Sequence, residues 1–85
     1  MKMSLYSIQL VLNATEQTIN ALESNLQWTK SSVIGELGQM KEAAADKCLE
    51  QMEGFSARVG AAVEDLKHIR SIMLSHKSFY DLMNE

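Results

Sequence analysis

The sequence predicts an all-α protein, an antiparallel helical hairpin with coiled-coil-like packing, in one domain spanning residues 1–85. Proline, the strongest helix breaker, is absent, and only four residues are glycine. Apolar residues recur in steps of three and four along two long segments, which places them on one stripe of a helix. These observations favour two long amphipathic helices whose stripes pack on each other.

The first helix is expected at about residues 4–28. Its apolar stripe alternates steps of three and four residues, the heptad spacing of a coiled coil, and only Thr15 interrupts it with a polar side chain. The stripe consists of Leu5, Ile8, Leu12, Thr15, Ile19, Leu22 and Leu26. We expect it to face the second helix.

The outer surface of this first helix is polar but carries few charges, and it holds a second, thinner apolar stripe. That stripe consists of Leu10, Ala14, Ala21 and Trp28. Because solvated helices usually interleave lysine and glutamate, a surface of this composition suits the docking of a partner. The alternative interpretation is a plain solvated exterior built from asparagine and serine.

The chain is expected to reverse direction within residues 29–38. Hydroxyl side chains that can cap a helix, such as Ser31 and Ser32, precede Gly35 and Gly38, which can adopt positive φ. The second helix is then expected at about residues 39–83. Its acidic residues lie mainly toward its beginning and its basic residues toward its end, which complements the helix dipole.

The second helix has the longer heptad stripe, and we expect it to form the rest of the core. The stripe consists of Cys48, Met52, Phe55, Val59, Ala62, Leu66, Ile69, Met73, His76, Tyr80 and Met83, and Val33, Leu37, Met40 and Ala44 extend it upstream. Its four methionines are expected to fill the core, and Cys48 to be an inert buried thiol. An interchain disulfide through Cys48 is the alternative.

The two expected helices are unequal, about 25 residues against about 45, a difference of about 30 Å in length. The shorter helix cannot cover the longer one, so part of the second stripe needs another chain. The aromatic residues Phe55, Phe79 and Tyr80 are the expected contacts, and pairing of two hairpins would give a four-helix bundle. A break at Gly54 would instead give a self-contained three-helix bundle.

Composition and motifs argue against several classes of function. A net charge of −3 and a pI near 5.3 disfavour nucleic acid, which needs a basic face. The pairing of Glu64 or Asp65 with His68 has ligand spacing but lacks further inward carboxylates, so we expect no metal, cofactor, small-molecule substrate or catalytic site. No signal peptide or membrane span is apparent, so we expect a cytoplasmic protein, or one exported without a cleaved signal peptide.

The chain resembles the WXG-type (ESX) substrates of type VII secretion and the small helical partners of LXG toxins. The similarity rests on its small acidic size, the absence of proline, Trp28 near the expected reversal, and an aromatic residue followed by acids at the C-terminus. Trp28 is followed by Thr29 and Lys30, where the family has a Trp-x-Gly turn. The resemblance implies helical hairpins that pair into four-helix dimers and are exported or direct a partner to export.

The expected function is therefore that of a non-enzymatic interaction module whose partner is a helical protein or a second copy of the chain. The most specific version of this expected function is that of a small adaptor, targeting factor or co-secreted partner of a type VII-like bacterial secretion system. A helical chaperone or structural subunit of the type III secretion kind is one alternative, and a self-assembling coiled-coil structural protein is another.

Overall fold

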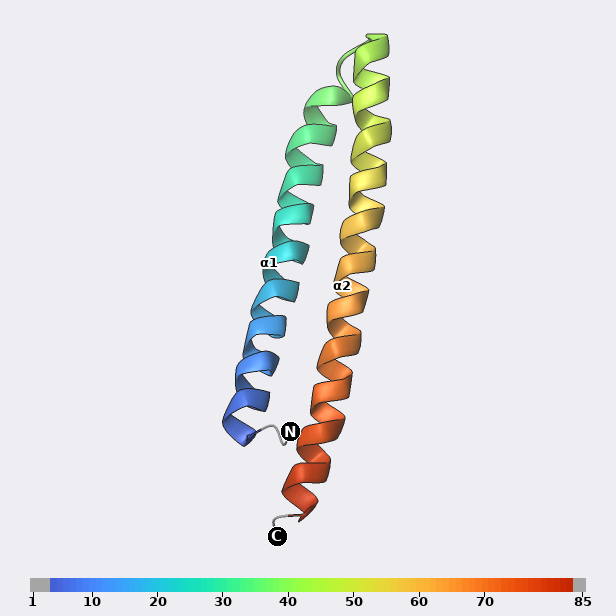
Figure 1. Cartoon of the computed structure of the whole chain (residues 1–85). Coiled ribbons are helices and arrows are strands. Elements are labelled where there is room, and N and C mark those ends of the chain that lie inside the picture. Colours follow the sequence, from blue (N-terminus) through green and yellow to red (C-terminus); the bar gives the residue numbers. More distant parts are fainter. Residues whose placement is uncertain (1–3, 84–85) are drawn as a thin grey trace.

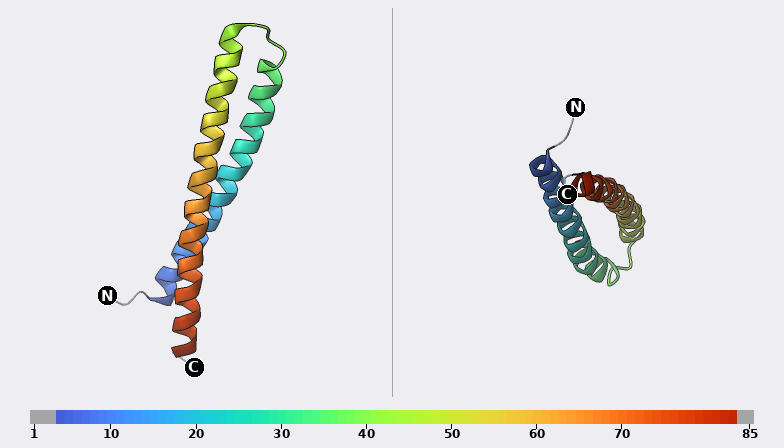
Figure 2. Two further views of the ribbon diagram at one scale, coloured as in Figure 1. Left: turned by 90° about the vertical axis from the view of Figure 1, so that its right-hand side faces the viewer. Right: turned by 90° about the horizontal axis from the view of Figure 1, so that it is seen from below.

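The computed structural model describes residues 4–83 and shows two long helices packed side by side in an antiparallel hairpin (Figure 1). Helix α1 spans Leu5–Leu37 and helix α2 spans Ala43–Met83. The hairpin measures 64 × 17 × 16 Å, and the two further views show the helices inclined to each other along its length (Figure 2). No strand occurs in the described part of the chain, so the all-α hairpin is confirmed.

Helix α1 begins where the sequence predicts, because Ser4 caps it. The Ser4 Oγ accepts a hydrogen bond of 3.1 Å from the backbone N–H of Ser7, which satisfies one of the amide groups that a helix start leaves without a partner. The backbone carbonyl of Ser4 also accepts the first helical bond, from the N–H of Ile8 at 3.0 Å.

The predicted place of the reversal is wrong, since the chain turns at residues 38–42 and not within 29–38. Helix α1 runs through the serines and Gly35 because Thr29, Val33 and Leu37 are half-buried and extend its inward stripe. Packing against α2 thus outweighs the local preference of serine and glycine for a turn. At Gly38 the backbone is right-handed, with φ −64°, and its N–H still donates to the carbonyl of Ile34 at 2.8 Å.

This later turn makes the helices nearly equal, with 33 residues in α1 and 41 in α2. Unequal length therefore does not explain a need for a partner, contrary to the expectation. Val33 and Leu37 belong to α1, and Met40 is exposed in the turn, so the predicted upstream extension of the second helix is also wrong. Helix α2 continues unbroken through Gly54, which removes the three-helix alternative.

The core is a narrow line of contact between the helices. Ile8, Leu12 and Ile19 of α1 are buried, as are Ala45 and Val63 of α2. The one buried polar side chain among the described residues is Thr15, whose Oγ1 donates to the carbonyl of Val11 at 2.9 Å. A polar residue is therefore tolerated in the stripe because its hydroxyl finds a partner within its own helix.

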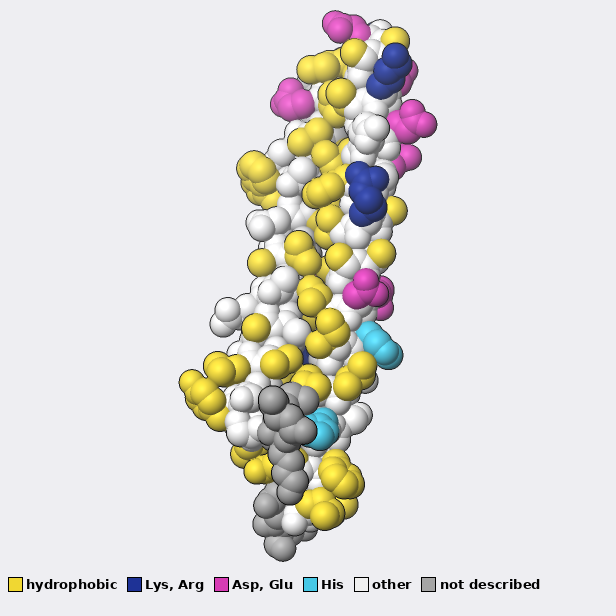
Figure 3. Space-filling model, viewed as in Figure 1, with side chains coloured by type: hydrophobic (Ala, Val, Ile, Leu, Met, Phe, Trp, Pro, Cys, Tyr) yellow, Lys and Arg dark blue, Asp and Glu magenta, His cyan; other side chains and the backbone are white. Residues whose placement is uncertain are grey.

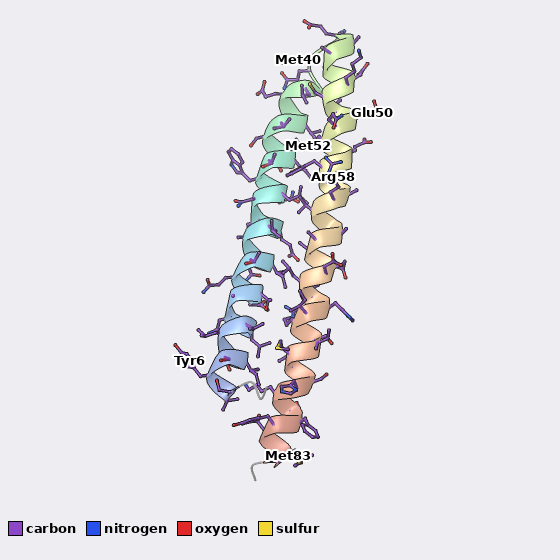
Figure 4. All side chains as sticks on the ribbon, viewed as in Figure 1. Tyr6, Met40, Glu50, Met52, Arg58 and Met83 are labelled. Atoms are coloured by element: carbon purple, nitrogen blue, oxygen red, sulfur yellow. The ribbon has the colours of Figure 1, made fainter. Side chains whose placement is uncertain are left out.

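Helix α2 does not bury the whole stripe that the sequence assigns to it. The half of the stripe that faces α1 consists of Met52, Val59, Leu66, Met73 and Tyr80, all half-buried. The other half is exposed and consists of Cys48, Phe55, Ala62, Ile69, His76 and Met83. The predictions of a buried Cys48 and of core-filling Met40 and Met83 are wrong. Side chains of both helices meet between the ribbons, whereas Tyr6 points away from α2 (Figure 4).

Replacing Gly60 with alanine should stabilise the protein by about 1 kcal/mol. Gly60 lies inside α2, and a Cβ built there meets nothing within 4 Å beyond the nearby backbone of its own helix, so the gain is the smaller loss of backbone entropy on folding. Denaturant unfolding followed by circular dichroism measures it. A destabilised Gly60→Ala variant would mean that α2 bends at this point.

Replacing Ile19 with alanine should destabilise the hairpin by about 3 kcal/mol, since it empties a buried position in the line of contact. Ile19 is 3% exposed, whereas Leu74, on α2, is 48% exposed and serves as the matched control. Leu74→Ala should cost less than about 1 kcal/mol. Equal losses in urea unfolding would place Leu74 in the core and overturn the assignment of faces.

Candidate functional site

One long side of the hairpin carries ion pairs that link the two helices. The Arg70 Nη1 lies 2.6 Å from the Glu16 Oε2, and the Lys67 Nζ lies 3.6 Å from the Glu23 Oε1. We call this side the paired face. Its groups are partly exposed, so each pair contributes little energy, but together they hold α2 in one rotational setting about its axis.

The side opposite the paired face follows from the 100° step between successive helical residues. In α1, Thr15 is buried against α2 and Glu16 lies on the paired face, so Ala14 must lie on the other side. The same rule puts Ala21 and Trp28 there, because each is seven residues further along. In α2, the residues that precede the inward stripe by one position lie on that side as well.

We call this second side the open face. In α1 it comprises Ser7, Val11, Ala14, Thr18, Ala21, Asn25 and Trp28; in α2 it comprises Cys48, Gln51, Phe55, Arg58, Ala62, Asp65, Ile69, Ile72, His76, Phe79 and Met83. Figure 3 views the hairpin from this side and shows hydrophobic side chains running along almost its whole length. Its large apolar side chains are well exposed, with Phe79 at 59% and Trp28 at 71%.

Charge divides the two faces sharply. In the first 26 residues of α1, the charged side chains are Glu16, Glu23 and Lys30, which are spaced by seven and therefore share the paired side. Among the residues named for the open face, Arg58 and Asp65 carry a formal charge, His being neutral, and Lys47 adjoins them near the turn. Exposing such an apolar face to water is unfavourable in free energy, and covering it with apolar groups of another chain is favourable because few charges lose their water.

A shallow groove of about 450 Å³ lies on the open face near the turn. Val33 of α1 forms one wall, and the other consists of residues of α2, the apolar Met52 and Phe55 together with Lys47, Cys48, Gln51 and Arg58. The groove exists because α1 offers only a small β-branched side chain opposite the larger side chains of α2. Its depth and apolar lining suit one or two aliphatic side chains of another helix.

The predicted partner-contact residues fall into two groups. Ala14, Ala21, Trp28, Phe55 and Phe79 are exposed on the open face, and Leu10 is exposed on the adjoining outer side of α1. Tyr80 does not join them, since it is half-buried in the inward stripe of α2. The sequence thus assigned the aromatic pair Phe79 and Tyr80 to one surface, whereas the structure separates them by one 100° step.

The predicted contacts omitted Ala62, Ile69 and Ile72 from the binding surface, because the heptad pattern assigned Ala62 and Ile69 to the core. The core uses instead a column with polar members, which consists of Leu49, Ser56, Val63, Arg70 and Lys77. The long stems of Arg70 and Lys77 cover α1 while their charged ends reach Glu16 and Gln9. The heptad spacing of the polar residues Gln9, Glu16 and Glu23 in α1 was the feature of the sequence that could have indicated which column of α2 faces α1.

Other kinds of site have little support in the described part of the chain. No three His, Cys, Asp or Glu side chains gather there in a group that could hold a metal ion. Cys48 is exposed and forms no disulfide within the chain. Neither helix, as far as described, is apolar enough over a sufficient length to cross a membrane.

Comparison of the chain with protein-family models, with curated proteins and with solved structures gave no match. The open face is therefore interpreted from its own geometry.

Reversing one charge of the Arg70–Glu16 pair should destabilise the hairpin, and reversing both should restore it. We expect Arg70→Glu to cost about 1 kcal/mol, a value kept small because water screens these exposed groups. The double variant Glu16→Arg, Arg70→Glu should recover most of this loss in urea unfolding. Absence of any recovery would show that the pair does not set the orientation of α2.

Proposed function

We propose that this chain is a non-enzymatic helical interaction module, which pairs through its open face with the helices of another chain. The observation that carries the proposal is the long, mainly apolar strip on that face, which the hairpin leaves uncovered. In α2 the strip extends from Cys48 to Met83, about 50 Å at 1.5 Å per residue. A strip of this length and heptad spacing suits an amphipathic helix.

The amount of exposed surface supports the same proposal. The chain exposes 6559 Å², whereas a compact monomer of 9.5 kDa exposes about 5,000 Å². The difference, about 1,500 Å², exceeds the roughly 800 Å² that each partner buries in a stable complex of ordinary size. Burying the open face against another chain would therefore supply the core that a two-helix hairpin lacks.

A role as a small adaptor, targeting factor or co-secreted partner in a type VII-like secretion system is the specific form of the proposal. It is supported by the helical hairpin, by the acidic composition, and by Trp28, whose ring lies exposed beside the small residues of α1. In such a role the chain would pair with a helical client and protect the apolar surface of both. A chaperone of the type III secretion kind would use the face in the same way.

The variant Ala62→Glu should abolish association through the open face, because it buries a charge at the centre of the strip. Ala57 is also an exposed alanine of α2, but it lies away from the open face, so Ala57→Glu is the matched control. We expect the wild type and Ala57→Glu to form a stable complex with the helical product of a neighbouring gene, or with themselves. Size-exclusion chromatography with light scattering measures both.

Association by Ala62→Glu as strong as that of the wild type would contradict the proposal. A wild-type chain that stays monomeric at all concentrations, with and without the neighbouring gene products, would contradict it as well. Circular dichroism of both variants establishes that their helices are intact.

A further inference from the structure

The open face of α2 is complementary to itself when the helix direction is reversed. Its two charged residues have opposite sign and lie on either side of Ala62, with Arg58 four residues before it and Asp65 three residues after it. Phe55 and Ile69 lie seven residues before and after Ala62. If two α2 helices pack antiparallel with Ala62 at the centre, Arg58 of each copy comes to within about one residue of the level of Asp65 in the other, and Phe55 of each lies level with Ile69 of the other.

The open face of α1 is self-complementary about the same level. The contacts of Glu16 with Arg70 and of Gln9 with Lys77 show that Ala62 lies level with about residue 24 of α1. Trp28 lies four residues after this level in α1, and Ala21 lies three residues before it. The same reversal that pairs Arg58 with Asp65 therefore sets Trp28 of one hairpin over the small Ala21 of the other.

The groove near the turn fits this arrangement as well. Met52, which lines the groove, is ten residues before Ala62, and Ile72 is ten residues after it. Reversal about Ala62 therefore brings Ile72 of a second copy to the groove. Ile72 is half exposed in the isolated hairpin, so it is free to enter.

We propose that the open face binds a second copy of this chain, antiparallel to the first, about a two-fold axis that passes beside Ala62. This inference rests on the proposed function and names the partner. It yields a four-helix bundle in which Arg58 of each copy pairs with Asp65 of the other. The excess surface of about 1,500 Å² per chain is enough for a stable dimer of this kind.

Pairing of the two hairpins in the same direction is the main competing arrangement, and the charges disfavour it. A parallel dimer sets α2 of one copy against α1 of the other, whose open-face residues carry no charge. Arg58 and Asp65 would then lose water without gaining a partner of opposite charge, which makes the burial of that face less favourable. Only the antiparallel arrangement pairs both charges.

Charge reversal tests the pairing. Each single variant, Arg58→Glu or Asp65→Arg, sets like charges opposite each other at two symmetric positions, and we expect the dissociation constant to rise at least about tenfold. The double variant Arg58→Glu, Asp65→Arg restores opposite charges and should restore the wild-type constant to within about threefold. Analytical ultracentrifugation over a range of concentrations measures all four proteins. A double variant as weak as the singles would overturn the inference.

The orientation is tested with the chain's single cysteine and single tryptophan. Spin labels on Cys48, which is exposed, should lie about 40 Å apart in the antiparallel dimer, since each label is 14 residues from the axis. A parallel dimer would bring them to the same level, well under that distance. Trp28 emission should shift to shorter wavelength as concentration rises through the dissociation constant, and Ala21→Glu should remove this shift. A short label distance, or unshifted emission on dimerisation, would overturn the inference.

Failure of the inference can be told from failure of the proposed function. If the wild type stays monomeric alone but forms a complex with a helical client that Ala62→Glu abolishes, the second-copy inference is wrong and the proposed function stands. If neither association occurs, both are wrong.

Discussion

The structure depends on how α2 is rotated about its own axis, and the contacts of Arg70, Lys67 and Lys77 with α1 set that rotation. Glu16 and Glu23 of α1 lie seven residues apart on one side of its apolar stripe, and they hold the cations of α2 on the same side. Each contact is weak alone, yet all require the same rotation. That rotation buries Val63 and turns Phe55 and Ile69 outward.

A second constraint is that two helices touch along only one line. A third or fourth helix is needed to cover an apolar stripe wider than that line, because each helix can turn only one strip toward a single neighbour. In this chain α2 has an apolar surface about two columns wide, and α1 covers one of them. The elongated shape of the two-helix hairpin, 64 × 17 × 16 Å, is the reason that it exposes so much more surface than a compact protein of its mass, and the uncovered column is part of that surface.

These constraints connect the fold to the proposed function. The paired face keeps the charges of α1 away from the open face, so burying the open face desolvates few charges, namely Arg58, Asp65 and, at the groove near the turn, Lys47. The small side chains of α1 beside the large side chains of α2 make the surface of this face uneven, which favours a partner whose surface has the complementary shape. A reversed copy of the same hairpin has such a profile.

Much of α1 was determined by the sequence alone, since periodicity and capping are local. Its inward stripe from Ile8 to Leu26 and its start at Ser4 agree with prediction, and so does the continuous helix that α2 forms. Only the tertiary structure decided where α1 ends and which column of α2 faces inward. Packing of Val33 and Leu37 against α2 outweighed the local turn signals, and the Arg70–Glu16 contact joins residues 54 positions apart, which no periodicity within one helix can encode.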